Sequence, residues 1–187
     1  GAEKAIEAGY PSDLIKSLRP ALTASYSGCG YLFEGLSFKG DETVIDLGAG
    51  AGLDSFIAAQ HLPNGQVISV DMTYEMLATM PAQQSNIKIL CADIEYLPLQ
   101  DASADMVISN ASINLAISKE KVSREAFRVL KDGGRLVAQD LIKTAELPAE
   151  VLTDPLSYNT SLGGALEEAA LIAEIEKAGF KDVKISE

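Results

Sequence analysis

Tryptophan is absent from this 187-residue chain, histidine occurs once, and cysteine occurs only at Cys29 and Cys91. Two cysteines form neither a disulfide framework nor a paired-cysteine metal motif, so we expect a cytoplasmic protein without a metal site. The chain also lacks an uninterrupted apolar run near the roughly 20 residues of a membrane span. Its N-terminal residues show no basic and then apolar pattern of a secretory signal.

Basic residues are in short supply as well, with 15 Lys and Arg against 27 Asp and Glu and a formal net charge of -12. Phosphate groups are bound by basic surfaces, so this balance excludes nucleic acid and anionic membranes as main partners. Hydrophobic residues make up 47% of the chain, which excludes a disordered protein. The length suits one domain with a full core, but composition says nothing about chemistry.

The chain divides into a lead-in and a core within one domain. Residues 1–38 are expected to be a helical lead-in and substrate or lid segment, with a helix that begins near residue 12. Residues 23–30 (TASYSGCG) are small and polar, which is typical of a loop. Residues 39–187 are expected to form the ligand-binding core.

From residue 43 onwards, short apolar runs alternate with helical patterns. The expected strands are 43–47, 67–70, 87–90, 106–108, 136–138 and 182–185. The expected helices are 53–61, 73–79, 118–130 and 165–178. This alternation predicts an α/β fold, a doubly wound, mostly parallel Rossmann-like sheet with helices on both faces. Ligands of such sheets bind beyond the carboxyl ends of the strands, so the residues there matter most.

The first expected strand runs into the glycine-rich sequence DLGAGAGLD, from Asp46 to Asp54. Glycines at alternate positions let the backbone turn sharply and approach a ligand closely. A dinucleotide fingerprint would place its third glycine at Leu53, so the spacing disfavours a nicotinamide cofactor. The Asp46 carboxylate would repel a pyrophosphate but could pair with an ammonium group. A tight turn without a ligand is the alternative.

Acidic residues follow the second and third expected strands. Asp71 lies about 20 residues beyond the glycine-rich loop, where a carboxylate can accept hydrogen bonds from ribose hydroxyls. Met72 beside it suits either an adenine face or the core. Asp93 could accept from the exocyclic amine of adenine while Ile94 covers the ring, but Asp is equally common in turns.

The fourth expected strand ends in Ser109-Asn110-Ala111-Ser112, where Asn110 either orients a ligand or belongs to a turn. Together the strand ends resemble the class I S-adenosylmethionine-dependent methyltransferases, through VIDLGAGAG, VDMT, CADIEYLP, SNASINL and LKDGGRL. The resemblance implies S-adenosyl-L-methionine as cofactor and S-adenosylhomocysteine as product. The cofactor-binding residues that it implies are Asp46, Gly48, Ala49, Gly50, Asp71, Met72, Asp93, Ile94, Ser109 and Asn110.

Within that superfamily, further stretches resemble the arsenite methyltransferases: SGCG, GDETVIDLGAGAGLD, VISVDMTYEML, EAFRVLKDGGRL and SLGGAL. This resemblance implies an arsenic(III) site of three thiolates, because a soft metalloid requires soft ligands. Cys29 stands at the first thiolate position, but Ala111 stands at the second and Ser161 at the third. Cys91 follows the adenine-side strand and is a poor replacement. We therefore expect an inherited scaffold with an altered substrate site, although Cys29 is equally explained as a small buried or loop thiol.

These motifs favour a methyltransferase (EC 2.1.1.-) that acts on a small molecule. No catalytic residue is identified, and the candidate acceptor-side residues are Cys29, Tyr26, Ala111, Ser112 and Ser161. The single histidine, His61, is expected near a helix C-terminus away from the strand ends, which favours an acceptor that needs no general base. A catalytically silent protein that binds S-adenosylmethionine or S-adenosylhomocysteine is the main alternative, and a nicotinamide oxidoreductase is a third hypothesis.

The end of the chain departs from the superfamily pattern. The resemblance implies two C-terminal strands, the last antiparallel and inserted beside the fifth, whereas this sequence stops at Glu187, after the first of them. We therefore expect six strands, with the final antiparallel strand missing. An open sheet edge of this kind is either exposed or covered by a second copy in a homodimer.

Overall fold

The computed structural model describes residues 1–80, 84–145, 147–148 and 161–186. Five parallel strands form one sheet in the order β3-β2-β1-β4-β5. Their bounds are β1 Thr43–Leu47, β2 Gln66–Asp71, β3 Ile87–Cys91, β4 Ala104–Asn110 and β5 Leu130–Gln139. The strand order reverses between β1 and β4, so the doubly wound sheet expected from the sequence is confirmed and its switch point lies there.

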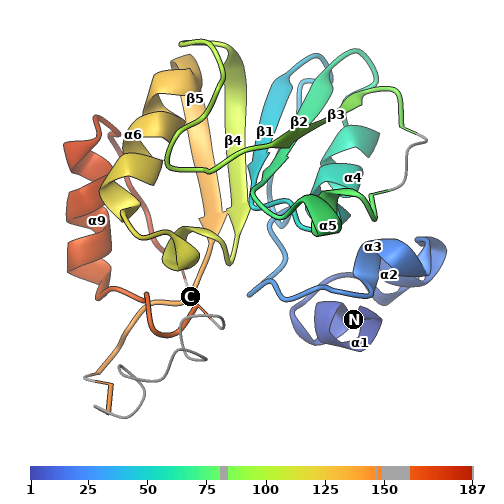
Figure 1. Ribbon diagram of the computed structural model, residues 1–187, viewed down its shortest axis with the longest axis horizontal. Coiled ribbons are helices and arrows are strands. Elements are labelled where there is room, and N and C mark those ends of the chain that lie inside the picture. Colours follow the sequence, from blue (N-terminus) through green and yellow to red (C-terminus); the bar gives the residue numbers. More distant parts are fainter. Residues whose placement is uncertain (81–83, 146, 149–160, 187) are drawn as a thin grey trace.

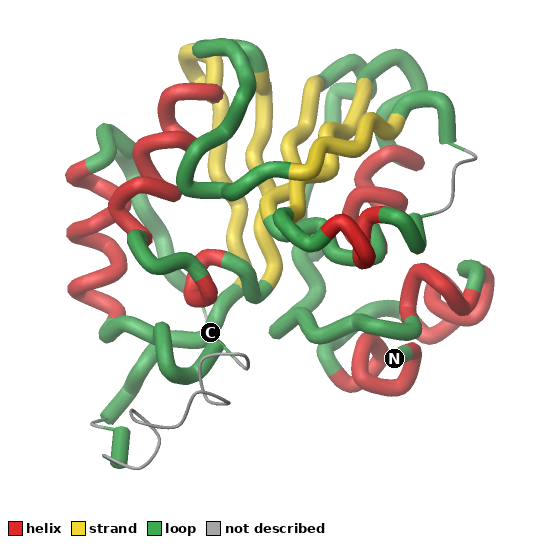
Figure 2. Tube along the Cα trace, in the orientation of Figure 1, coloured by secondary structure: helices red, strands yellow, loops and turns green. Residues whose placement is uncertain are grey.

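Helices cover both faces of this sheet, and three short helices of the lead-in lie beside it (Figures 1 and 2). The bounds are α1 Ala2–Glu7, α2 Ser12–Ser17, α3 Pro20–Thr23, α4 Leu53–Gln60, α5 Tyr74–Leu77, a 3-10 turn Ile113–Leu115, α6 Lys119–Val129 and α9 Glu168–Lys177. In Figure 1, α6 and α9 lie on one side of the molecule and α4 and α5 on the other. Across the described residues, no helix is both long and apolar enough to span a membrane.

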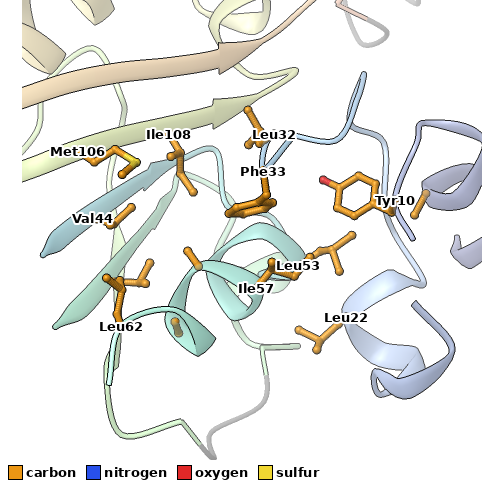
Figure 3. Packing of buried hydrophobic residues seen from close by; sticks show 14 of the residues in the cluster. Tyr10, Leu22, Leu32, Phe33, Val44, Leu53, Ile57, Leu62, Met106 and Ile108 are labelled. Atoms are coloured by element: carbon orange, nitrogen blue, oxygen red, sulfur yellow. The ribbon is translucent and has the colours of Figure 1, made fainter. Parts of the chain in front are cut away.

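Alternate side chains of the strands supply two hydrophobic cores. Val44 packs with Ile57 of α4 and with the lead-in, whereas its neighbour Ile45 packs with Val122 of α6. This follows from the two-residue period of a strand. Figure 3 shows Tyr10 and Leu22 of the lead-in in the same cluster as α4. The lead-in is therefore fixed to the core by buried apolar surface, at about 1.5–3 kcal/mol for each fully buried large side chain.

The start of β5 differs from the expectation of a helix up to residue 130 and a strand only from residue 136. Helix α6 ends at Val129, and Leu130 already pairs with Ala104. The next paired residues are Met106 and Arg135, so residues 131–134 form a bulge that the glycines of the sequence accommodate. Gly133 has φ +76°, a conformation that side chains rarely adopt.

The expectation of a sixth strand at residues 182–185 is wrong, because these described residues form no strand. A groove of about 420 Å³ separates β5 from this segment, and Leu136, Ala138, Ile175 and Val183 contribute to its lining. A strand needs the backbone groups of a neighbour for its hydrogen bonds. The segment pairs with no strand among the described residues, and the sheet has five strands there.

Candidate functional site

The glycine-rich loop folds over the carboxyl ends of β1 and β2. Gly48, Gly50 and Gly52 all have positive φ, at +73°, +55° and +87°. The backbone N–H groups of Gly48 and Ala49 both donate to the carbonyl of Val70, at 2.8 and 2.9 Å. A Cβ atom on Gly48 would overlap the side chain of Ser112. The glycines at alternate positions thus permit a backbone conformation that larger residues would adopt only with strain.

Asp71 joins the end of β2 to this loop. Its Oδ2 accepts from the backbone N–H of Gly50 at 2.9 Å, and its Oδ1 accepts from that of Thr73 at 2.8 Å. Each carboxylate oxygen has a second acceptor site. Asp71 can therefore hold the loop in place and still accept hydrogen bonds from two neighbouring hydroxyl groups.

Side chains at the ends of β2 and β3 are open to solvent. Met72 is 72% exposed, so it does not belong to the core. Asp93 is exposed and accepts from the backbone N–H of Glu95 at 2.8 Å, which makes it a turn residue with a free face. Ile94 is half-buried against the α6 side of the core. The exposed Cys91 thiol lies 3.7 Å from the carbonyl of Met72. We call this region, where the resemblance implies the adenine, the adenine end of the cleft.

Two carboxyl groups, by contrast, are buried beneath the glycine-rich loop. Asp46 and Asp54 are 2% and 7% exposed. Ser55 donates its hydroxyl to Asp46 at 2.6 Å. Burial, together with the nearby charge of Asp54, raises the pKa of Asp46 to about 7. Burial also raises the pKa of Asp54, although hydrogen bonds oppose the rise. A cation placed beside Asp46 would favour its charged form.

A small pocket of about 70 Å³ lies between the glycine-rich loop and the lead-in. Asp46, Asp54 and residues 48–51 line one side of it, and residues 25–28 line the other. The loop predicted at 23–30 therefore meets the glycine-rich loop directly. We call this region, with the residues that adjoin it around Cys29, the acceptor end of the cleft.

Tyr10, Asp54 and Asn110 form a hydrogen-bonded group at this end, which we call the amide cluster. The Tyr10 hydroxyl donates to Asp54 Oδ1 at 2.5 Å. The Asn110 amide nitrogen donates to Asp54 Oδ2 and Tyr10 Oη, both at 3.0 Å, and to the carbonyl of Gly30 at 2.8 Å. The Asn110 Oδ1 accepts from the backbone N–H of Cys29 at 2.8 Å. Asn110 is thus bound to protein groups on every side.

Sequence reasoning missed two members of this cluster. Asp54 stands in the glycine motif, and its place directly after the loop could have identified it. Tyr10 gives no local signal, because its partner lies 44 residues away. Conversely, His61 lies outside the cluster, at the end of α4, where its ring stacks on Phe38 at 5.0 Å.

The structure places Ala111 and Ser161 in contact, and both lie next to the amide cluster. The Ser161 hydroxyl donates to the carbonyl of Ala111 at 3.0 Å, and both residues are buried. Both have positive φ, at +58° for Ala111 and +63° for Ser161, which costs free energy in residues with a side chain. Ser112 donates to the carbonyl of Leu47 at 2.6 Å and lies 2.6 Å from the Ser109 hydroxyl.

The Cys29 thiol and the Tyr26 phenol are held in their neutral forms. Burial, followed by the charge of Asp140, raises the pKa of the Cys29 thiol to about 11. Burial is also the main cause that raises the pKa of Tyr26 to about 12. Both groups are therefore protonated near neutral pH, so neither is a ready base.

The geometry can be set beside known proteins. Residues 38–182 match the model of the methyltransferase domain family. The arsenite methyltransferase of Halobacterium salinarum is 38% identical over 184 residues, covering 95% of this chain and 47% of that protein. The human arsenite methyltransferase is 32% identical over 183 residues, covering 90% and 48%. The chain thus spans about half the length of these relatives.

A solved structure agrees with these matches. The arsenic(III) S-adenosylmethionine methyltransferase from Chlamydomonas reinhardtii has a TM-score of 0.77 at 32% identity, covering 97% of this chain and 62% of that one. The resemblance found in the strand-end motifs is confirmed by these similarities. On the family match over 38–182 and the sheet that carries the site, the chain belongs to the methyltransferase domain family.

Proposed function

We propose that the protein transfers a methyl group from S-adenosylmethionine to a small-molecule acceptor, at a site that differs from a three-thiolate arsenic site. The observation that carries this proposal is the meeting of two sets of residues at one end of the sheet. The glycine-rich loop with Asp71 forms one set, and Cys29 with the Ala111–Ser161 contact forms the other.

The residues at the strand ends suit this cofactor. The buried acid Asp46 would pair with an ammonium group, and Asp71 would accept from the two ribose hydroxyls. The glycine-rich loop carries no side chain larger than a methyl group from residue 48 to residue 52, so the remaining part of the ligand could approach its backbone closely. At the adenine end, Met72 and Ile94 would cover the ring, and the free face of Asp93 would meet its amine.

When bound, S-adenosylmethionine supplies a methyl group on a positively charged sulfur that leaves as a neutral thioether. The protein's task is then alignment and exclusion of water rather than activation of the donor. Residues 25–28 face the glycine-rich loop across the small pocket and would serve that purpose. Because Cys29 and Tyr26 are protonated, the acceptor has to be nucleophilic without their help. We infer a thiolate, a metalloid or a carbanion-like carbon.

Ala111 and Ser161, which we call the acceptor wall, support the proposal that the substrate differs from arsenite. Ala111 and Ser161 stand where the arsenite methyltransferase resemblance implies thiolates, and their mutual hydrogen bond brings these positions together. One thiol, Cys29, remains beside them. A single neutral thiol does not satisfy a metalloid that takes three thiolates.

A second candidate function is cofactor binding without turnover. The same hydrogen bond between Ser161 and Ala111 favours it, because it fills the acceptor wall with groups that react poorly. This candidate predicts binding of S-adenosylhomocysteine with no methyl release on any acceptor.

The decisive experiment is a methyl-release assay with arsenite and with thiol acceptors. It compares the parent protein with the double variant Ala111→Cys and Ser161→Cys. We expect the parent to methylate a thiol acceptor and the double variant to gain activity on arsenite. The cysteines would occupy the same backbone positions as the residues that they replace.

The matched control is Ala111→Ser with Ser161 unchanged, which places two hydroxyls where the double variant has two thiols. Arsenite methylation by the parent would contradict the altered site. A double variant that binds S-adenosylhomocysteine and gains nothing would contradict the assignment of positions 111 and 161. Binding by every variant, with no methyl released from any acceptor, would establish the second candidate.

A further inference from the structure

The carboxamide of Asn110 joins segments that are far apart in the sequence. It bonds to Tyr10 of the lead-in, to Asp54 at the start of α4 and to both Cys29 and Gly30, at 2.8–3.0 Å. An amide side chain offers two N–H groups and one carbonyl oxygen, so these contacts occupy both of its ends. Asn110 therefore links protein segments to one another while it lines the pocket.

Through Asp54, this amide is linked to the glycine-rich loop. Asp54 is the second residue of α4, directly after the loop, and it lines the same pocket as residues 48–51. Tyr10 and Asp54 are buried, at 2% and 7% exposure, so their hydrogen bonds have no competition from bulk water. Groups buried in this way fix one arrangement strongly, because each unmade bond is costly.

The Cys29 segment also approaches Asn110 too closely to tolerate a shift. A Cβ atom on Gly28 would lie 2.7 Å from Asn110 Cγ and 2.7 Å from the Tyr26 hydroxyl. Displacement of the glycine-rich loop would move Asp54, and displacement of Asp54 would break the bonds to the amide. The loop and the Cys29 segment are therefore both held through the amide of Asn110.

We propose that Asn110 is a positioning residue, which uses the amide cluster to hold the Cys29 segment against the glycine-rich loop. A ligand on that loop consequently controls access to the Cys29 thiol. The identity of the ligand, S-adenosylhomocysteine in the test, rests on the proposed function. This coupling orders the reaction, with the cofactor bound first and the acceptor site completed by it.

The test measures alkylation of Cys29 by iodoacetamide, followed by intact-protein mass, in a Cys91→Ser background that removes the exposed thiol. In this parent we expect saturating S-adenosylhomocysteine to slow alkylation at least about fivefold. In Asn110→Ala we expect the ligand-free rate to rise about tenfold, equivalent to the loss of one net hydrogen bond. The protection by ligand should disappear, at a ligand concentration that calorimetry shows to be saturating for that variant.

Asn86→Ala is the matched control. Its amide also bridges backbone groups, the carbonyls of Ala59 and Leu62, both at 3.0 Å, but near the end of α4 and away from the site. This variant loses the same chemical group and should keep the parent's alkylation rate and protection. A general loss of stability would change the alkylation rate of Cys29 in both variants, whereas a positioning role changes it only in Asn110→Ala.

Two further variants keep the proposal testable if Asn110→Ala fails to fold. Tyr10→Phe removes one hydroxyl from the cluster and should give about half of the effect on a logarithmic scale, since it retains the Asn110 bonds to Gly30 and Cys29. Gly28→Ala keeps every hydrogen-bonding side chain but crowds the amide, and it should expose Cys29 in the same way.

The outcomes separate this proposal from the proposed function. If the variants bind S-adenosylhomocysteine and Cys29 keeps the parent's alkylation rates with and without ligand, the positioning role is overturned. Failure of the parent itself to bind S-adenosylhomocysteine would overturn the proposed function. Even if the parent does not bind this ligand, the role of Asn110 can be tested. Alkylation of Cys29 at the parent's ligand-free rate in Asn110→Ala and Gly28→Ala would overturn it.

Discussion

At the adenine end of the cleft, Met72, Cys91 and Asp93 are exposed, and each lies at the end of its strand or within two residues after it. At the acceptor end, Tyr10 and Asp54 are buried and bonded to residues from other parts of the chain. The positions of the residues in the first region depend on where the strands end, which short sequence motifs determine. The positions of the residues in the second region depend on a hydrogen-bond network whose members come from distant parts of the chain. Under the proposed function, a substrate site that changes at the acceptor end leaves the local motifs of the adenine end as they are.

The largest effect is expected from Asp71→Ala, which tests the end built from local motifs. The variant loses two charge-assisted hydrogen bonds, to the backbone N–H groups of Gly50 and Thr73. We expect affinity for S-adenosylhomocysteine to fall on the order of a hundredfold, measured by calorimetry. Asp132→Ala, which removes an exposed carboxylate elsewhere, should leave affinity unchanged. Equal affinities in the two variants would refute the role of Asp71.

A smaller effect is expected from pH, and it belongs to the buried end. The pKa of Asp46, raised to about 7 by burial, means that the carboxyl is largely protonated at pH 6 in the free protein. A cationic ligand group prefers the charged form, so affinity should rise about tenfold between pH 6 and pH 8. Asp46→Asn should abolish this slope. A slope that persists in Asp46→Asn would assign it to another group.

The same raised pKa affects the stability of the free protein. The folded protein holds a proton on Asp46 that the unfolded chain releases near pH 4, so the free energy of unfolding falls as pH rises towards about 7. At pH 8, Asp46→Asn should be more stable than the parent by about 1 kcal/mol, in urea unfolding without ligand. At pH 4 this advantage should vanish. An equal gain in the free energy of unfolding at pH 4 and pH 8 would rule out burial of the Asp46 charge as its cause.

The smallest effect is expected from Cys91→Ser at the adenine end. Cys91 is exposed, and its one described contact, to the carbonyl of Met72, is a weak thiol hydrogen bond. Methyl-release activity should stay within about twofold of the parent, because a hydroxyl can replace this contact. A loss of tenfold or more would mean that the adenine end depends on packing that exposure alone does not reveal.

Sequence reasoning succeeded where structure is local. The apolar run at residues 43–47 coincides with β1, and Asp46 to Asp54 spans the loop that the structure folds over the strand ends. Periodicity and glycine spacing act over a few residues, so a short window contains the information. The helix expected over 165–178 likewise contains α9, Glu168–Lys177.

Features that depend on contacts between distant segments could not be predicted from short stretches of sequence. Tyr10 joins the site through tertiary packing, and the contact of Ser161 with Ala111 spans 50 residues. The bulge at the start of β5 depends on the register of Ala104 and Met106 in another strand. Strand formation at residues 182–185 requires a neighbouring strand, which hydrophobic pattern alone cannot supply.

Calorimetric titration with S-adenosylhomocysteine tests the central claim most directly, that the cofactor end is intact although the acceptor end has changed. The account predicts about one ligand per chain with a dissociation constant on the order of micromolar, near −8 kcal/mol. NADH should give no binding signal, because the G-x-G-x-G spacing and Asp46 disfavour a pyrophosphate. Binding of NADH together with no response to S-adenosylhomocysteine would contradict the account.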